Sequence, residues 1–301
     1  MIKNLPKIRG KYLFDEPLAK YNWFKTGGKA DILFMPKDKE DLIYFLKNKP
    51  KDLPIFILGA GSNLLIRDGG IRGVVILLKK TLNNISINKE GDIEISCGIL
   101  NSKVLNFCKV NEIGGYEFLG TIPGSIGGSI RMNAGCYGSE IKDKLVNIDT
   151  VDLNGNEKTY LNKECNFEYR NNNLPKDLIF VSAIFDGSEK SSKEKIEKSF
   201  KEKSEKRKLS QPIGNKTCGC TFKNPEGLSA WRLIQEAGFQ GLEVNGAKMS
   251  EKHANFMVNT GTARSSDLED LGEKIQEKVK QDTGVNLEWE VQRVGDRHCL
   301  P

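Results

Sequence analysis

The chain has 301 residues, of which 38% are hydrophobic and 29% are charged, and its formal net charge is +6. This length is enough for two or three compact domains, and the composition is that of an ordinary globular protein. The mild positive charge fits a pocket for phosphorylated ligands better than a nucleic-acid surface, which needs a concentrated basic stripe with interleaved aromatic residues.

The N-terminal segment, residues 1–68, predicts a helix at DKEDLIYFLKNK (38–49) and a buried strand at PIFILG (54–59). Its first residues, MIKNLPKIRGKYLFDEP, contain no long apolar run and no cleavage pattern, so we expect neither a signal peptide nor a transmembrane span. The next segment, residues 69–190, is rich in short strand-like runs that glycine turns separate. These runs are 73–78, 92–98, 147–155 and 178–185.

Residues 191–212 belong to a mixed-charge run that predicts a solvated connecting helix ending near Pro212. Opposite charges four residues apart, such as Glu194 and Lys198, support the helix. A nucleic-acid-binding arm is the alternative, and the interspersed glutamates disfavour it.

The C-terminal segment, residues 213–301, predicts two helices. One covers 228–238, with Gly238 as its C-cap, and the other covers 265–281 and buries one face. That face carries Leu268, Leu271, Ile275 and Val279.

A strand is predicted at VNLEWEVQRVG (285–295), where apolar and polar residues alternate. The period of two places Glu288 and Glu290 on the face away from Trp289.

The chain reads GAGSN (59–63) directly after the predicted strand 54–59. Its beginning resembles a dinucleotide fingerprint, but Leu64 stands where the third glycine belongs, and the next residues suggest strand and turn. A Rossmann domain is therefore disfavoured. The turn still exposes backbone N–H donors, and Ser62 and Asn63 add side-chain donors, which suits a pyrophosphate. A plain glycine turn is the alternative.

A second glycine-rich loop is GTIPGSIGGSIRMNAGCYGSEI (120–141). Such density costs backbone entropy and is tolerated where the main chain closely approaches a flat or charged ligand. Two such loops predict a long ligand held by backbone amides, and a flavin dinucleotide has that shape. Two mobile surface loops are the alternative.

Seven motifs in chain order resemble one family, the UDP-N-acetylenolpyruvoylglucosamine reductases (MurB), over nearly the whole chain. They are TGGKADILFMP (26–36), LGAGSNLLIRDGGIRGVVI (58–76), the loop 120–141, EYRNNNL (168–174), CGCTFKNP (218–225), HANFMVN (253–259) and LEWEVQRVG (287–295). The short span between EYR and CGCTFKNP resembles the branch of the family that lacks a large inserted substrate loop.

The resemblance implies an α+β protein with the vanillyl-alcohol-oxidase (PCMH-type) FAD-binding fold, not a Rossmann fold. Its two FAD-binding subdomains would be residues 1–68 and 69–190, followed by the connecting helix 191–212 and a C-terminal α+β substrate-binding domain, 213–301. It also implies FAD-mediated, NADPH-dependent reduction of UDP-N-acetylglucosamine enolpyruvate to UDP-N-acetylmuramate, in peptidoglycan precursor synthesis. The only histidines, His253 and His298, lie in the last segment, so we expect the FAD to be bound non-covalently.

The matched motifs supply candidate ligand-binding residues. Those expected to bind the cofactor are Gly59, Ala60, Gly61, Ser62, Asn63, Gly120, Thr121, Pro123, Gly124, Gly127, Gly128, Asn133 and Gly135. Those expected to bind the substrate or the nicotinamide phosphates are Tyr169, Lys223, Asn224 and, more weakly, Lys208.

The resemblance assigns two catalytic residues directly. Arg170 matches the family's catalytic arginine, and a guanidinium grips a carboxylate bidentately and stays charged. Glu290 matches the catalytic glutamate, for which we expect a raised pKa or a relay role beside an anionic intermediate. Without the surrounding motifs, Arg170 would be interpreted as a surface salt-bridge residue and Glu290 as an exposed strand residue.

Cys220 stands where the family has its proton-donating serine. A thiol, with a reference pKa of about 8.5, is a stronger acid than an alcohol, so we expect Cys220 to donate the proton to the substrate's α-carbon. Nearby Arg170 and Lys223 would favour the thiolate, which cannot donate.

Cys218 has no family role, and Cys-x-Cys without further ligands is a weak metal signal, so we expect no metal site. A Cys218–Cys220 disulfide would be strained. Seven cysteines at irregular spacing indicate reduced thiols, so we expect a cytoplasmic protein. We also expect a monomer without membrane or nucleic-acid partners. We expect structural roles for His253 and Asn259.

Two other functions stay open at this point. One is a flavin oxidoreductase of the same fold that oxidises an alcohol or hydroxy acid. The other is a catalytically silent nucleotide- or flavin-binding module, which the cysteine at position 220 favours.

Overall fold

The structure is a computed structural model that describes residues 4–79 and 81–297. The chain divides into two compact units. Unit 1 comprises residues 1–13, 32–60 and 73–205, and unit 2 comprises 14–31, 61–72 and 206–301. Both units therefore contain segments that are far apart in the sequence.

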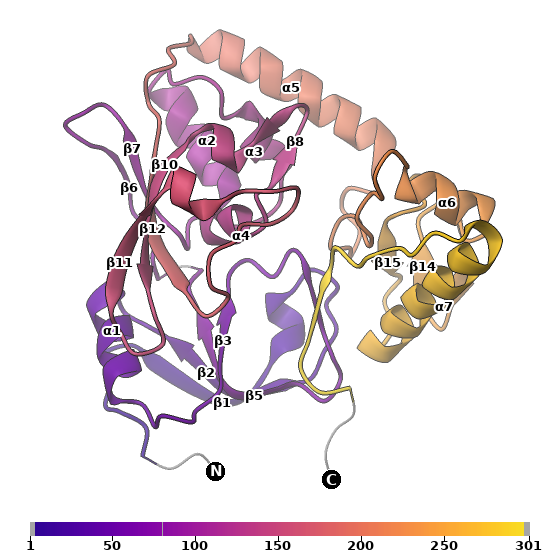
Figure 1. The fold of residues 1–301 in the computed structure, drawn as a ribbon, viewed down its shortest axis with the longest axis horizontal. Coiled ribbons are helices and arrows are strands. Elements are labelled where there is room, and N and C mark those ends of the chain that lie inside the picture. Colours follow the sequence, from indigo (N-terminus) through magenta and orange to yellow (C-terminus); the bar gives the residue numbers. More distant parts are fainter. Residues whose placement is uncertain (1–3, 80, 298–301) are drawn as a thin grey trace. The chain divides into compact units, whose positions relative to one another are not determined.

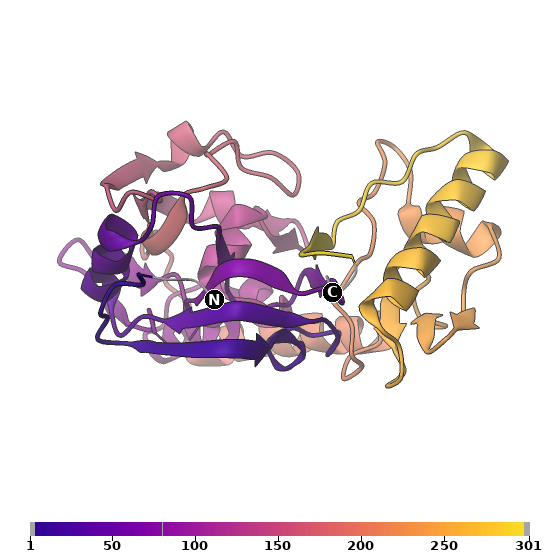
Figure 2. The same ribbon diagram turned by 90° about the horizontal axis from the view of Figure 1, so that it is seen from below.

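A four-stranded sheet has the order β1-β2-β5-β3, with β1 at Lys11–Pro17, β2 at Lys29–Met35, β5 at Ile71–Leu77 and β3 at Ile55–Leu58. Its strands lie side by side in Figure 2. Helix α1 (Lys39–Asn48) begins at Asp38, whose side chain accepts from the amide of Asp41. The predicted helix at 38–49 and the predicted strand at 54–59 are thus confirmed.

A five-stranded antiparallel sheet belongs to unit 1, in the order β11-β10-β12-β7-β6. The strands are β11 (Glu157–Leu161), β10 (Leu145–Val151), β12 (Ile179–Phe185), β7 (Ile93–Ser96) and β6 (Ile85–Ile87). The pairing of β10 with β12 contains a β-bulge at Val181. Asp149 is opposite Ser182 and the next residue, Thr150, is opposite Phe180, so Val181 has no opposite residue on β10. This bulge puts Phe180 and Phe185 on the same face, against simple alternation.

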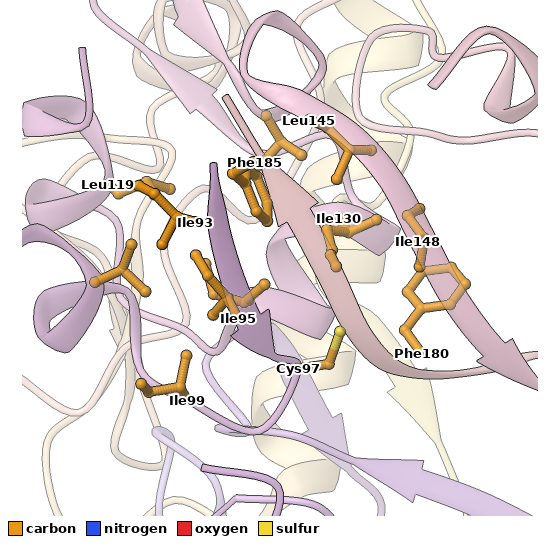
Figure 3. Close-up of a cluster of buried hydrophobic side chains, with 14 of the residues drawn as sticks. Ile93, Ile95, Cys97, Ile99, Leu119, Ile130, Leu145, Ile148, Phe180 and Phe185 are labelled. Carbon is orange, nitrogen blue, oxygen red and sulfur yellow. The ribbon is translucent and has the colours of Figure 1, made fainter. Parts of the chain in front are cut away.

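Three short helices pack against this sheet in unit 1: α2 (Asn101–Val110), α3 (Glu117–Thr121) and α4 (Ile126–Arg131). Their buried side chains join those of β7, β10 and β12 in one core, which Figure 3 shows. Phe180, Ile130 and Ile148 are among its members. A second core joins α1, β2 and β5 to Ile179 and Val181 of β12, so both faces of the sheet are covered.

The remaining elements of unit 1 are β8 (Gly135–Cys136), β9 (Ser139–Glu140) and the 3-10 turns η2 (Ile141–Asp143) and η3 (Asn162–Cys165). Helix α5 (Lys193–Ser210) carries the chain from unit 1 into unit 2 (Figure 1). It corresponds to the helix predicted from the mixed-charge run. Ile196 is its buried residue, so α5 is a largely solvated helix, as the composition predicts.

Unit 2 contains the 3-10 turn η1 (Leu18–Tyr21), a three-stranded antiparallel sheet and a two-stranded parallel pair. The sheet is β13 (Glu243–Val244), β14 (Ala247–Met249) and β15 (Met257–Asn259); the pair is β4 (Leu64–Ile66) and β16 (Gln292–Val294). Helices α6 (Ala230–Glu236) and α7 (Ser265–Thr283) cover the core. The predicted apolar face of α7, from Leu268 to Val279, is buried as expected.

Distant residues fix the start of α7. The backbone amides of Ser265 and Ser266 donate to the carboxylate of Asp68, at 3.0 and 2.9 Å. One turn later the buried Glu269 accepts from Arg67 at 2.8 Å and from Arg293 at 3.1 Å. Arg67 follows β4 and Arg293 lies in β16, so this charge cluster fastens the parallel pair to the helix.

Two local predictions are wrong. The strand predicted over 285–295 is formed only at β16, with one isolated bridge between Trp289 and Phe222, because the chain bends at Val291 and changes its pairing partner. The loop predicted over 120–141 contains α4 and the β8–β9 pair. Glycines 127 and 128 lie inside α4, where packing on its neighbours outweighs their poor helix propensity.

Candidate active site

The glycine turn 59–63 connects β3 to β4. In a Rossmann fingerprint a helix follows the glycine turn, whereas here a strand follows it, so the prediction that this turn is not such a fingerprint is confirmed. Gly61 has φ +64°, and a Cβ there would lie 2.1 Å from the carbonyl oxygen of Tyr21. The carbonyl of Gly61 also accepts from the amide of Trp23 at 3.0 Å. A glycine is therefore required at 61 by a close approach inside unit 2.

The two glycine-rich stretches meet in unit 1. A Cβ placed on Gly59 would lie 2.6 Å from Oγ of Ser125, and one on Gly128 would lie 3.7 Å from the same atom. Gly59 therefore packs its backbone closely against the buried Ser125 side chain and leaves no room for a Cβ, whereas the exposed Gly128 would accept one in ordinary contact. Ser125 was not among the predicted site residues, although its place between Gly124 and the Gly127–Gly128 pair is a usable signal.

Other predicted cofactor residues have partners inside unit 1. The amide of Gly127 donates to the carbonyl of Cys97 at 2.9 Å, and a Cβ at Gly120 would lie 2.1 Å from Leu105. Thr121 donates to the carbonyl of Phe118 at 2.8 Å. Close packing therefore explains these residues, and their contact with a cofactor stays a prediction, as it does for Ala60, Ser62, Pro123 and Gly124.

Arg170 lies in a tight turn of unit 1, with an antiparallel bridge between Glu168 and Asn171. Its φ of +56° is left-handed, which is costly for a residue with a Cβ. The guanidinium donates to the carbonyl of Gly135 at 3.2 Å and lies 4.8 Å from the ring centroid of Tyr169, which is exposed. Gly135 thus positions the arginine.

Buried Asn133 supports the same turn. Its side-chain amide donates to the carbonyl of Glu168 and to the carboxylate of Glu140, both at 3.0 Å. Its side-chain oxygen accepts from the amide of Lys142 at 3.2 Å. Asn133 therefore joins β9 to the segment that precedes Arg170.

Cys220 lies in unit 2, in a segment (220–222) whose main chain is hydrogen-bonded to residues 255–256 on one side and to residues 288–290 on the other. We call these three segments the main-chain ladder. Cys220 forms a bridge with Phe256 on one side, and the amide of Thr221 donates to the carbonyl of Asn255 at 2.7 Å. The buried side chain of Asn255 clamps Phe222, accepting from its amide at 2.9 Å and donating to its carbonyl at 2.8 Å. Asn255 was not among the site residues predicted from the sequence, because no local pattern indicates that its side chain holds Phe222.

Glu290 lies on the other side of the same segment. Its amide donates to the carbonyl of Thr221, the residue after Cys220, at 2.8 Å. The side-chain amide of Asn63 donates to the carbonyl of Glu290 at 3.0 Å. The structure therefore brings the Cys220 and Glu290 segments together in unit 2, and ties both to the end of the first glycine turn. Arg170 belongs to unit 1.

The predicted substrate residues of unit 2 have identifiable contacts. Lys223 pairs with the exposed carboxylate of Glu288 at 3.2 Å, and the side-chain oxygen of Asn224 accepts from the amide of Ala230 at 3.0 Å. Lys208 is exposed in the last turn of α5, where its carbonyl accepts from Lys252 at 3.0 Å. Lys223 is thus the cation of this group nearest in sequence to Cys220.

Cys218 and Cys220 have different surroundings. Cys218 is buried, its thiol donates to the carbonyl of Leu64 at 3.4 Å, and burial raises its pKa to about 12. Cys220 is partly exposed. The described part of the chain has no cluster of three or more His, Cys, Asp or Glu side chains that would hold a metal ion.

His253 and Asn259 make structural contacts. The His253 ring centroid lies 4.8 Å from that of Phe256, its Nδ1 accepts from the amide of Asn255 at 3.3 Å, and burial lowers its pKa. Buried Asn259 donates to the carbonyl of Phe24 at 2.8 Å. In the described ranges, none of the helices has the combined length and apolar character that a membrane crossing demands.

Residues 211–294 match the family profile described as UDP-N-acetylenolpyruvoylglucosamine reductase, C-terminal domain, and residues 30–159 match the FAD binding domain profile. The chain is 47% identical over 292 residues to the UDP-N-acetylenolpyruvoylglucosamine reductase of Rickettsia bellii, covering 97% of this chain and 96% of that relative. The Rickettsia akari enzyme of the same name is 48% identical over 291 residues, covering 97% and 98%.

A crystal structure of the UDP-N-acetylenolpyruvylglucosamine reductase from Thermus caldophilus superposes with a TM-score of 0.81. It is 31% identical and covers 95% of this chain and 99% of that one. With the FAD binding domain match, this similarity confirms the predicted fold class, an α+β FAD-binding fold that is not of the Rossmann type.

Proposed function

The chain belongs to the UDP-N-acetylenolpyruvoylglucosamine reductase family of FAD-dependent oxidoreductases of peptidoglycan precursor synthesis, and from this premise we propose how its residues perform the reaction. The reaction adds a hydride to the β-carbon of the enolpyruvyl ether of UDP-N-acetylglucosamine and a proton to its α-carbon. The product is UDP-N-acetylmuramate. The electrons come from NADPH.

The glycine cradle fits the cofactor. FAD supplies hydride transfer when it is bound. Gly59 and Gly128, which bring backbone close to the Ser125 hydroxyl, offer the side-chain-free surface that a pyrophosphate or a flat ring needs. The other glycines of both stretches, with Ser62 and Asn63, complete the proposed binding surface.

Cys220 donates the proton to the α-carbon. Hydride addition leaves negative charge at this carbon, delocalised into the substrate's carboxylate, so a nearby acid is required. A neutral thiol transfers its S–H proton to the carbon and is left as a thiolate, which solvent reprotonates. The Thr221 and Asn255 contacts hold the Cys220 backbone in place for this step.

Arg170 and Glu290 complete the catalytic group. The guanidinium pairs with the substrate's carboxylate and stabilises the charge that develops there. Glu290, on the segment bonded to Thr221, either donates as a neutral acid or relays a proton to the thiolate. Tyr169 packs on the arginine beside the same carboxylate.

Lys223, Asn224 and Lys208 bind the phosphates of the substrate or of NADPH. Their positions in one unit with Cys220 support this assignment. We further propose a cytoplasmic monomer without nucleic-acid or membrane partners, in which residues 1–68 and 69–190 are FAD-binding subdomains, 191–212 a connecting helix, and 213–301 the substrate-binding domain. The short span between EYR (168–170) and CGCTFKNP (218–225) supports the further proposal that the chain belongs to the branch of the family that lacks a large inserted substrate loop.

One observation carries the assignment of the proton donor. The segment that holds Cys220 is hydrogen-bonded directly to the segment that holds Glu290, through the 2.8 Å contact between Thr221 and Glu290. The two residues are separated by 70 positions in the sequence, so a coincidence of local motifs does not produce this pairing.

Stopped-flow absorbance of the flavin tests the proposal. In Cys220→Ala, reduction by NADPH should proceed as in the wild type, whereas reoxidation by the enolpyruvyl substrate should slow by about 10²- to 10⁴-fold, the usual contribution of a general acid. Cys220→Ser, which keeps an acidic hydrogen at the same place, should retain activity. Equal slowing of both half-reactions in Cys220→Ala would contradict the role of the thiol.

A further inference from the structure

The turn that carries Arg170 contains three consecutive asparagines, and only the middle one is buried. Asn172 is 4% exposed, whereas Asn171 and Asn173 are exposed. A buried amide is costly unless its hydrogen bonds are made, so the partners of Asn172 are informative.

Those partners lie in another element of unit 1. The side-chain amide of Asn172 donates to the carbonyl of Ile130 at 2.9 Å and to the carbonyl of Arg131 at 3.0 Å. Its side-chain oxygen accepts from the amide of Leu174 at 3.2 Å. Ile130 and Arg131 are the last residues of α4, whose terminal carbonyls need partners from outside the helix. Asn172 thus fastens the turn to the end of α4.

The neighbouring asparagines have different partners. The side chain of Asn171 donates to Asn173 at 3.1 Å, and that of Asn173 donates to the carbonyl of Asn166 at 2.9 Å. These contacts stay within the turn. Asn171 is therefore a matched control, of the same residue type and adjacent to Arg170 in the sequence.

Arg170 needs such support because its backbone is strained. A left-handed φ of +56° persists in a residue with a Cβ only where its surroundings hold it. One support is Asn133, which grips Glu168 before the arginine, and the other is Asn172, two residues after it. Both contacts, and the Gly135 carbonyl that accepts from the guanidinium, come from α4 or from the residues directly after it.

We infer that Asn172 is a positioning residue for the proposed reaction: by capping α4, it holds Arg170 in the conformation that presents the guanidinium to the substrate's carboxylate. This rests on the proposed function of Arg170. Asn172 acts through Arg170, and its removal displaces the arginine while the cofactor cradle at Gly59 and Ser125 stays formed.

A double-mutant cycle tests the inference, with flavin reoxidation by the enolpyruvyl substrate as the measured step. Asn172→Ala should slow reoxidation about 30- to 100-fold, the usual cost of a misplacement near 1 Å, and leave reduction by NADPH within about threefold of the wild type. In an Arg170→Ala background, Asn172→Ala should cost less than about threefold more, because its effect passes through the arginine. Asn171→Ala should match the wild type in both steps.

The outcomes separate the possible failures. If Arg170→Ala cripples reoxidation but Asn172→Ala behaves like Asn171→Ala, the inference alone is wrong. An equal cost of Asn172→Ala in both backgrounds also overturns it, since a merely structural role is independent of the arginine. Unchanged reoxidation in Arg170→Ala overturns both the inference and the proposed function of that residue.

Flavin content and the NADPH step report whether each variant is folded. If Asn172→Ala fails to fold, Asn172→Ser takes its place, because its hydroxyl is too short to bond both carbonyls of α4 and still leaves a polar group at this position. A selective loss of reoxidation in Asn172→Ser supports the inference, and reoxidation at the wild-type rate overturns it.

Discussion

Cys220 and Glu290 are held by a main-chain ladder, whereas Arg170 is held mostly by side-chain amides. In unit 2, the segment after Cys220 is hydrogen-bonded on both sides, to Asn255 and to Glu290, and the buried Phe222 continues it. In unit 1, the left-handed turn of Arg170 depends on Asn133 and Asn172. The turn depends on these two side chains to hold the arginine, so substitutions around the turn should affect catalysis more than stability.

In unit 2, the charge cluster around Glu269, which fastens the parallel pair to α7, should show the largest effect on stability. Replacing a buried carboxylate that pairs with Arg67 and Arg293 leaves both cations without their shared partner, so Glu269→Gln should lower the free energy of unfolding by about 3–5 kcal/mol. Urea denaturation at pH 7 measures this. The exposed Glu277→Gln in the same helix is the control, and an equal effect of the two would contradict the prediction.

The same cluster predicts a pH dependence. Burial alone would raise the pKa of Glu269, but the hydrogen bonds and charge of Arg67, with the charge of Arg293, hold it below its ordinary value. Since the folded pKa is the lower one, the stabilisation is complete above the unfolded value of about 4.3 and is lost as the pH falls through the folded pKa. The wild type's advantage over Glu269→Gln should therefore disappear in acid, and its persistence there would exclude a charge effect.

Asn255 supports the ladder directly, and its loss should be somewhat milder. Asn255→Ala leaves the amide and carbonyl of Phe222 buried without their partner, at about 1–2 kcal/mol each, so we expect a loss of about 2–4 kcal/mol in unfolding free energy. The exposed Asn286→Ala is the control. Asn255→Ala should lose more stability than Asn172→Ala does, and the reverse order would break the contrast between ladder and turn.

The smallest effect concerns the two cysteines of the CGC motif. Burial raises the pKa of Cys218 to about 12, so at pH 8 this thiol should resist iodoacetamide while the partly exposed Cys220 reacts. Mass spectrometry of the peptide that carries both residues measures their labelling, and urea should expose both. Cys218→Ala should change turnover less than about threefold. Equal labelling of the two thiols in the native protein would contradict the prediction.

Periodic patterns predicted much of the fold because each depends on residues that are close in the sequence. Helix α7 buries the face from Leu268 to Val279 as its spacing predicts, and the turn 59–63 leads into a strand. The prediction of a strand over 285–295 was wrong because its outcome depends on residues that are distant in the sequence. The pairing partner changes at Val291 from Phe222 to β4, and no local pattern indicates this change.

The residue types of the site are a property of the sequence, since a thiol, a guanidinium and a carboxylate stand in recognisable motifs. Their supports depend on tertiary structure. The side chain of Asn63 donates to the carbonyl of Glu290, 227 positions away, and Asn172 has its partners 42 and 41 positions away. A buried amide bonds to whichever main chain the fold brings beside it, so only the folded chain determines what an asparagine holds.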